Sequence, residues 1–335
     1  MPALYVVEEG ARVEKEYQRI LVTRDDQILQ RLQLSKVSEV VLVGSSAGVT
    51  TQALHALLEA GVPFFIVRRS GELLGRLCPP AAPNHALRLR QVQLSSQDVF
   101  CLPIGREIVR AKLRNQRILA QRMLRRRQAG PSEKLDSLET ASQAAASASD
   151  FDTLLGLEGA AARSYFELFE TWLDPAWNFK ERERRPPPDP INSLLSLGYM
   201  LLTHAAQTAL EICDLDPYFG VYHREKYGKP ALALDLVEEF RAPIVDSLVL
   251  GLVNRNYLEP TDFEIEHPST QPAAYLKPAA LRLFLREYGK KLEQPVRVNG
   301  LQRTISYRKL MEVQARKLAR LFLGTDETYQ PYLSR

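Results

Sequence analysis

Four residues between positions 158 and 238 have acidic or imidazole side chains in mainly apolar, helical sequence. They are Glu158, His223, Asp235 and Glu238. Burying such groups costs free energy unless a partner compensates for the lost hydration. A divalent cation is one such partner, and it would equip the protein for chemistry on phosphates.

Asp235 and Glu238 are three residues apart in a stretch that is apolar on both sides. On a helix this spacing makes the two carboxylates neighbours, and they repel each other unless a metal ion or a basic group lies nearby. Local ion pairing that involves Glu239 and Arg241 offers a structural alternative for the acid pair. The pair alone therefore leaves both interpretations open.

Glu158 borders the apolar stripe of its expected helix, whereas a simple solvated acid would lie opposite that stripe. His223 follows Gly220 in a polar stretch, where a lone histidine more commonly has a structural role. Taken together, the acids would provide oxygen ligands and His223 one imidazole. That mixture suits Mn²⁺ and, less well, Mg²⁺.

Composition excludes several classes of protein. The 335 residues suffice for two domains, 45% of them are apolar, and the net charge of +4 alone does not establish a nucleic-acid partner. The three cysteines, Cys78, Cys101 and Cys213, are far apart and fit reduced thiols of a cytoplasmic protein. The acidic N-terminus does not resemble a secretory signal, and the uncharged stretch 193–210 contains enough polar residues to favour a buried helix over a membrane span.

The pattern of apolar residues predicts an α+β protein with a small N-terminal β-rich domain followed by a larger all-α C-terminal domain. Domain boundaries are expected at 1–78 for a β-rich domain, 79–95 for a linker that begins with a proline-rich stretch, and 96–335 for a helical domain that carries the four acid and imidazole residues. The expected strands are 4–8, 19–23, 39–43, 64–67 and 72–77, with one helix at 49–60. The expected later helices are 86–94, 104–127, 150–172, 190–212, 231–256, 275–288 and 303–323.

Two segments look irregular. Residues 140–149 are rich in alanine and serine and predict either a mobile loop or a weak helical extension. Residues 180–190 predict an extended connector that leads into a helix capped by Asp189, with Pro190 in its first position.

The helix expected at 104–127 carries nine cations and one acid, Glu107. Such a helix repels itself and favours a polyanion unless acids from other helices neutralise it. The sequence leaves both possibilities open. The candidate contacts of this helix with a polyanion are Arg110, Arg114 and Arg117.

Several stretches together resemble the CRISPR-associated spacer-acquisition integrase, the "Cas-one" family, over nearly the whole chain. The N-terminal part contributes residues 4–6, 49–54 and 71–77. The more specific stretches are 157–166, 187–202 and 215–255, which include Leu-Asp-Pro-Tyr-Phe-Gly-Val-Tyr-His followed by Pro-Ala-Leu-Ala-Leu-Asp-Leu-Val-Glu-Glu-Phe-Arg.

The resemblance implies a specific site and activity. In this family a glutamate, a histidine and a C-terminal acid bind one divalent cation, and by motif these are Glu158, His223 and Glu238. Asp235 would lie beside the site in a supporting catalytic role, with Mg²⁺ or Mn²⁺ as the cofactor. The implied reaction is attack of a DNA 3′-hydroxyl on a phosphodiester of the CRISPR repeat, and water in its place gives endonuclease cleavage.

The implied partners are protospacer DNA, the CRISPR repeat, a second copy of the chain and the small "Cas-two" protein. The resemblance also makes residues 1–78 the dimerisation domain and residues 96–335 the catalytic domain. Further candidates for phosphate contacts near the metal are Arg184, Arg185, Lys226, Lys229 and Arg241. Two other functions stay open, a repair nuclease for branched DNA and a DNA-binding scaffold whose acids pair with arginines.

Overall fold

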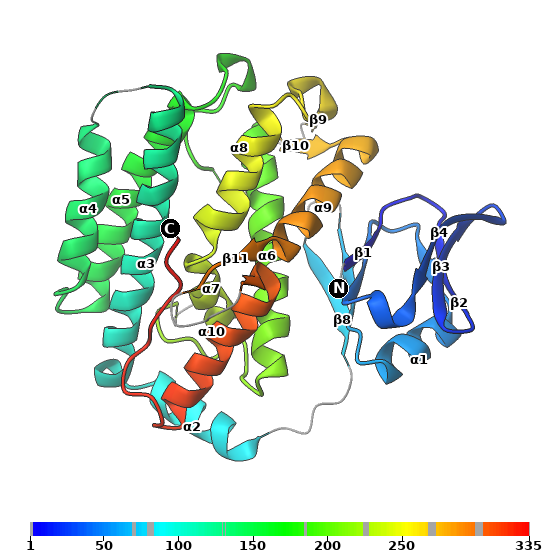
Figure 1. The fold of residues 1–335 in the computed structure, drawn as a ribbon, viewed down its shortest axis with the longest axis horizontal. Coiled ribbons are helices and arrows are strands. Elements are labelled where there is room, and N and C mark those ends of the chain that lie inside the picture. The colour runs from blue at the N-terminus through cyan, green and yellow to red at the C-terminus, as the bar shows by residue number, and fades with distance from the viewer. Residues whose placement is uncertain are drawn as a thin grey trace. The chain divides into compact units, whose positions relative to one another are not determined.

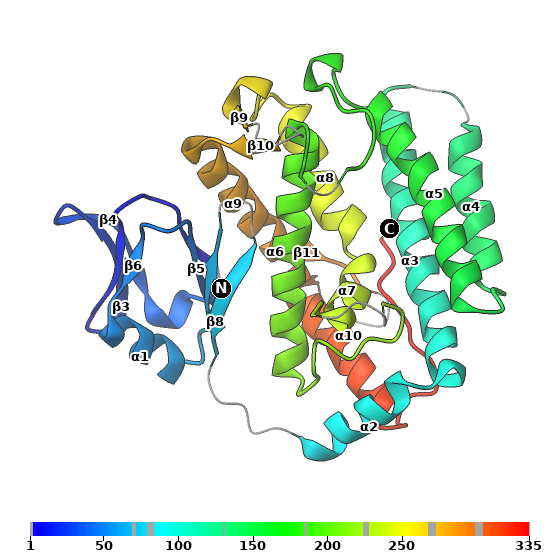
Figure 2. The same cartoon turned by 180° about the vertical axis from the view of Figure 1, so that it is seen from behind.

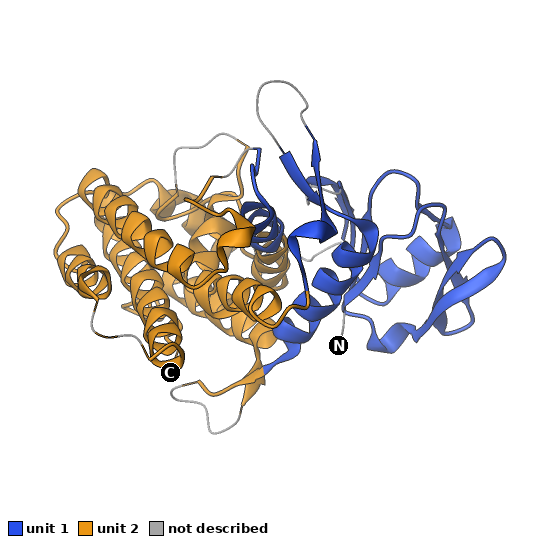
Figure 3. Cartoon of the chain, turned by 90° about the horizontal axis from the view of Figure 1, so that it is seen from above, with its two compact units in different colours: residues 1–80, 185–200, 258–294 blue, residues 81–184, 201–257, 295–335 orange. Residues whose placement is uncertain are grey.

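The computed structural model describes residues 3–68, 72–78, 84–128, 130, 132–183, 186–223, 228–266, 273–298 and 304–334. The chain divides into two compact units (Figure 3). Unit 1 comprises residues 1–80, 185–200 and 258–294, and unit 2 comprises residues 81–184, 201–257 and 295–335. Both units are thus assembled from separate stretches of the chain, whereas the predicted domain boundaries divide it only once.

Unit 1 contains two four-stranded sheets. The first has the order β1-β5-β7-β8, in which β1 (Ala3–Val6), β5 (Glu39–Val43) and β7 (Phe64–Val67) are parallel and β8 (Leu73–Leu77) is antiparallel to β7. The second has the order β4-β3-β2-β6, formed by β2 (Arg12–Glu16), β3 (Arg19–Arg24), β4 (Gln27–Gln33) and the short β6 (Gly48–Val49).

The core of unit 1 joins the two sheets to helix α1 (Thr51–Glu59), and Figure 2 shows these elements together. The Thr50 side chain accepts a hydrogen bond from the Ala53 N–H and so begins α1 as an N-cap. Val6, Val13 and Leu57 are among the side chains fully buried in this core.

Residues 185–200 and 258–294 form the rest of unit 1. An antiparallel pair of strands, β9 (Phe263–Glu266) and β10 (Ala273–Leu276), follows the short 3₁₀ helix η4 (Pro260–Asp262) and precedes helix α9 (Pro278–Glu293). Arg282 of α9 lies 3.8 Å from the Glu8 carboxylate. Asp189 accepts a hydrogen bond from the Asn192 N–H at 2.9 Å, so it caps helix α6 (Pro190–Ile212) as expected, with Pro190 in first position.

Unit 2 is mainly helical. Helices α3 (Asp98–Arg126), α4 (Glu133–Ala145) and α5 (Phe151–Thr171) pack side by side (Figure 1). Helix α2 (His85–Ser95) contacts α3 and α10 (Tyr307–Phe322). The remaining short elements are η1 (Leu34–Lys36) in unit 1, and η2 (Pro175–Trp177), β11 (Pro295–Val296) and β12 (Ile305–Ser306) in unit 2.

The helix predicted at 231–256 is three consecutive elements. Helix α7 (Ala231–Glu238) is followed by a π-helical turn, η3 (Arg241–Asp246), and then by α8 (Ser247–Val253). Pro243 lies within the π-helical turn and cannot donate a backbone hydrogen bond, which accounts for the change of helical pitch there.

The predicted fold class is confirmed: a β-rich N-terminal region precedes a largely helical remainder. The expected weak segment at 140–149 is for the most part regular helix, because Leu138, Ser142 and Ala145 form the buried face of α4. The three cysteines are free thiols. No helix among the described residues is long and apolar enough to cross a membrane.

Candidate active site

The four acid and imidazole residues singled out in the sequence come together within unit 2. Glu158 lies on α5, Asp235 and Glu238 lie on α7, and His223 ends a described loop that begins after α6. Asp235 and Glu238 are only 1% and 2% exposed. The four side chains together form a buried polar cluster in an otherwise apolar helical environment.

Lys112 of α3 lies between two of these acids. Its Nζ donates a hydrogen bond to Glu158 Oε1 and lies 2.8 Å from Glu238 Oε2. The Lys112 side chain is 7% exposed, so this is a buried ion triad rather than a surface salt bridge. Two carboxylates from different helices therefore share one positive charge.

Asp235 organises the loop that carries His223. Its Oδ2 accepts hydrogen bonds from the Val221 N–H at 2.6 Å and the Tyr222 N–H at 3.0 Å. Its Oδ1 accepts from the His223 N–H at 2.9 Å and lies 2.9 Å from His223 Nδ1. The other ring nitrogen, Nε2, is left 3.8 Å from Glu238 Oε1.

Two further groups complete the surroundings of the acids. The Tyr222 hydroxyl donates a hydrogen bond to Glu158 Oε2. Arg241, the first residue of the π-helical turn, lies 3.0 Å from Glu238 Oε1 through its Nη2. Each of the two glutamates is thus contacted from two sides.

The opposite charges of the cluster stabilise the ionised forms of one another. Burial by itself would raise the pKa values of Glu158 and Glu238, but Lys112, together with Arg241 at Glu238, holds both pKa values below the ordinary one. Burial would lower the pKa of Lys112, yet the two glutamates keep it raised. Burial also opposes protonation of His223, and Asp235 outweighs it, so the His223 pKa is raised.

The donor atoms fit a divalent cation in kind. Two carboxylates and one imidazole, with a third carboxylate at the far ring nitrogen, form a ligand set typical of Mn²⁺ or Mg²⁺ sites. Glu238 Oε2 is fully buried and takes part in no hydrogen bond among the described residues, although it faces the Lys112 ammonium. Within the described ranges, however, no three acids, histidines or cysteines are already spaced as metal ligands. The place between the acids is held by the ammonium instead.

A second layer of hydrogen bonds lies behind α3 and α7. Glu239 accepts from the Tyr329 hydroxyl at 2.7 Å, from Gln314 Nε2 at 2.9 Å and from the Tyr332 N–H. Asn115, one turn after Lys112, donates to the backbone oxygens of Glu239 at 2.7 Å and Tyr332 at 3.0 Å. The C-terminal segment, residues 324–334, therefore ties together the two helices that carry Lys112 and Glu238.

The residues expected to contact DNA differ in their surroundings. Arg184, Arg185 and Lys226 lie outside the described residues, and Lys229 is exposed just before α7. Arg117 forms an ion pair with Glu139 of α4 at 3.3 Å, and Arg110 pairs with Glu107. Arg114 is exposed on the same helix. Acids thus neutralise part of the basic helix, as the structural alternative anticipated.

Lys112 and Tyr222 escaped the sequence-based selection of site residues. Lys112 was counted among the cations of the basic helix, yet it follows Ile104 and Ile108 at intervals of four, which places it on the buried face. That periodicity was a usable signal. Tyr222 offers none beyond its position next to His223.

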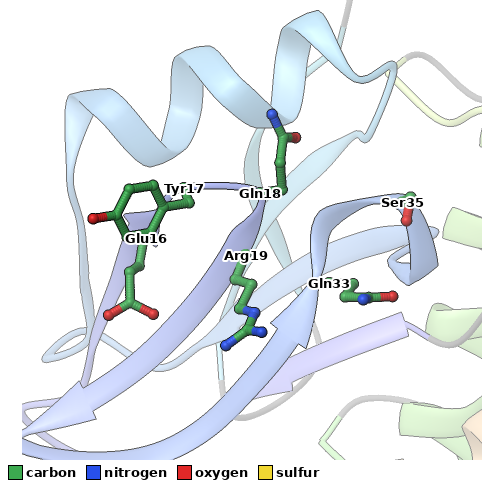
Figure 4. Close-up of a pocket in the computed structure, with 6 residues that line it drawn as sticks. All are labelled: Glu16, Tyr17, Gln18, Arg19, Gln33 and Ser35. Atoms are coloured by element: carbon green, nitrogen blue, oxygen red, sulfur yellow. The ribbon is translucent and has the colours of Figure 1, made fainter.

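A surface pocket lies elsewhere, on unit 1. Glu16, Tyr17, Gln18, Arg19, Gln33 and Ser35 line it around the turn between β2 and β3 (Figure 4). Tyr17 is 86% exposed there, and none of the predicted site residues borders this pocket.

The chain was compared with known proteins and structures. The sequence model of the family described as CRISPR associated protein Cas1 matches residues 4–290. A "CRISPR-associated endonuclease Cas1 3" of Thermus thermophilus is 34% identical over 334 residues, which cover 99% of this chain and 97% of that relative. A "CRISPR-associated exonuclease Cas4/endonuclease Cas1 fusion" of Rhodospirillum rubrum is 36% identical over 338 residues, 99% of this chain but only 57% of the fusion.

Among solved structures, a chain of a "Cas6-RT-Cas1--Cas2 complex" superposes with a TM-score of 0.83 at 27% identity, covering 99% of this chain and 36% of that chain. The chain thus spans little more than half of the fusion it matches and about a third of the chain in that complex. The family match over residues 4–290 and the relative that is 34% identical along nearly its whole length show that this chain belongs to the Cas1 family of CRISPR-associated proteins.

Proposed function

We propose that this chain is a metal-dependent DNA endonuclease and integrase of CRISPR adaptation, acting in the cytoplasm. The observation that carries the proposal is the convergence of Glu158 and Glu238 on one buried positive charge, with His223 Nε2 3.8 Å from Glu238. Two buried carboxylates that converge in this way favour a cation between them. The relatives named as Cas1 endonucleases support the activity.

In this proposal Glu158, Glu238 and His223 would hold Mg²⁺ or Mn²⁺. The ion would supply Lewis acidity at a phosphodiester oxygen and offset the negative charge that develops during an in-line displacement. Asp235 binds the Nδ1 side of His223 and so directs Nε2 toward the site. The hydrogen bonds that it accepts from three backbone N–H groups hold the loop against α7.

The displacement would join or cut DNA according to the nucleophile. Attack by the 3′-hydroxyl of a short DNA fragment transfers it to the repeat strand, and attack by water cleaves the strand. Arg241 and Lys229 are proposed to contact the phosphates beside the site, together with Arg184, Arg185 and Lys226. Such contacts position the backbone and carry little sequence information.

Two protein partners belong to the proposal. A homodimer formed by the N-terminal β-rich region is supported by the edge strand β4, on which Ile28 and Leu29 are 49% and 42% exposed. A Cas2 protein as the second partner is supported by the similarity of this chain to a chain of the solved Cas6-RT-Cas1--Cas2 complex.

A strand-transfer assay with a DNA fragment, a repeat-containing duplex and Mn²⁺ tests the proposal. Glu238→Ala and His223→Ala are expected to lower transfer by about 100-fold or more, because each removes a metal ligand. Asp152→Ala, an exposed change on α5, serves as the control. Full activity of either site variant contradicts the assignment.

The same assay separates the alternatives. An integrase joins the fragment to the repeat, a repair nuclease only cuts, and a DNA-binding scaffold does neither. The scaffold also predicts that Mn²⁺ leaves the melting temperature unchanged, whereas an engaged ion raises it with the logarithm of its excess over Kd.

A further inference from the structure

Lys112 occupies the place that a bound cation would take between Glu158 and Glu238. Its ammonium is in contact with both carboxylates, and its side chain is more buried than that of Glu158 and slightly less buried than that of Glu238. A lysine rarely takes so buried a position without carboxylate partners, since an isolated ammonium loses several kcal/mol of hydration there. The three side chains therefore form one electrostatic unit.

The acids of the metal-free cluster carry one more charge than its two basic side chains. Glu158, Asp235 and Glu238 contribute three negative charges, and Lys112 and Arg241 contribute two positive charges. A divalent ion together with Arg241 would balance the three acids without Lys112.

If Lys112 stayed in its contacts while the ion bound, the buried cluster would hold one uncompensated positive charge. Uncompensated charge in a buried place is strongly unfavourable. The ammonium also shares the facing oxygens, Glu158 Oε1 and Glu238 Oε2, that an ion between the two acids would use. The charge balance and the shared oxygens therefore both indicate that the divalent ion replaces the Lys112 ammonium rather than binding beside it.

We propose that Lys112 is a displaceable internal counter-cation, which holds Glu158 and Glu238 in place without metal and leaves both carboxylates when the divalent ion binds. The inference rests on the proposed metal-binding function of the same acids. Lys112 is accordingly a positioning residue with two opposite effects. It stabilises the metal-free protein, and it weakens the apparent affinity for the ion.

Lys112→Met tests this directly, because methionine keeps an unbranched side chain and removes the charge. Binding of Mn²⁺ is measured by titration calorimetry, and melting temperature is measured with and without Mn²⁺, at a pH well above the ordinary pKa of carboxylic acids. Compared with wild type, the variant should melt lower without metal, bind Mn²⁺ with a Kd at least about tenfold lower, and gain more melting temperature from the ion.

Two further variants keep the result interpretable. Lys134→Met removes a lysine of the same unit that pairs with Glu167 at the surface, 2.7 Å apart and half exposed, and it should leave both measurements unchanged. Lys112→Met combined with Glu158→Gln removes one charge of each sign. It should recover most of the metal-free stability and lose the tight Mn²⁺ binding, even if the single variant folds only with Mn²⁺.

The outcomes separate the two proposals. If wild type binds Mn²⁺ and Lys112→Met binds it equally or more weakly, exchange is disproved and the metal-binding function stands. If neither protein binds Mn²⁺, the acids are not a metal site and both proposals fail. Tighter binding by the single variant with lower metal-free stability supports exchange.

Discussion

Asp235 fixes His223 through both the main chain and the imidazole ring. One carboxylate oxygen accepts from the His223 N–H at 2.9 Å and lies 2.9 Å from Nδ1. The other accepts from two preceding N–H groups of the same loop. A single buried side chain therefore fixes residues 221–223 of the loop and determines which ring nitrogen faces Glu238.

Asp235→Asn should lower the pKa of His223 and destabilise the protein. The amide keeps one acceptor oxygen and turns N–H donors toward backbone N–H groups, which leaves buried groups unpaired at a cost of about 1–3 kcal/mol. Loss of the negative charge also removes the main interaction that raises the His223 pKa against burial. NMR titration of the histidine ring protons and urea unfolding measure the two effects.

Asp152→Asn, on the exposed side of α5, is the control for Asp235→Asn and should change neither quantity. An unchanged His223 titration in Asp235→Asn would show that the ring is held by other groups.

Gly220→Ala should disrupt the same loop by crowding. A Cβ at Gly220 would lie 2.8 Å from Ala231 Cβ and 2.9 Å from Asp235 Oδ2, and backbone of α7 closes the same space. The loop must then move away from α7, so we expect a loss of about 1–3 kcal/mol in unfolding free energy and weaker Mn²⁺ binding. Gly159→Ala is the matched control: its Cβ meets nothing within 4 Å, and alanine in a helix should stabilise by up to about 1 kcal/mol. Equal effects of the two changes would contradict the close packing.

Glu239 should make stability fall as the pH rises. Burial raises its pKa to about 7, although three groups donate hydrogen bonds to it. The folded protein therefore holds this proton more tightly than the unfolded chain. The resulting stabilisation is complete below the ordinary glutamate pKa of about 4.5 and is lost as the pH rises through 7.

Glu239→Gln resembles the protonated acid and should remove this pH dependence. The difference in unfolding free energy between variant and wild type should shift in favour of the variant by roughly 3 kcal/mol between about pH 4 and about pH 8. Denaturant unfolding at both pH values measures it. Glu327→Gln, exposed in the same C-terminal segment, should show no such shift. Parallel pH profiles for wild type and Glu239→Gln would contradict a raised pKa.

The periodicity of apolar residues was enough to predict the fold class and most helices, because amphipathic faces are local in sequence. Strand β4 was missed because it is exposed along nearly its whole length and carries no alternation of buried residues. Glu158 and Glu238 are 80 positions apart in sequence. That they belong to one site was predicted from the family resemblance and not from any local pattern. The role of Lys112 could be recognised only from its tertiary contacts, because in the sequence it is one of many cations on a basic helix.

The basic helix α3 yields a prediction about DNA affinity. Arg114 is exposed, whereas Arg117 forms an ion pair with Glu139. If DNA follows this helix, Arg114→Ala should weaken binding and reduce the slope of log affinity against log salt by about one. Glu139→Gln should act in the opposite direction, because it releases Arg117 for a phosphate. Fluorescence anisotropy with labelled duplex at several salt concentrations measures both. Unchanged affinity in both variants would show that the cations of α3 serve packing between α3 and α4 and that DNA binds elsewhere.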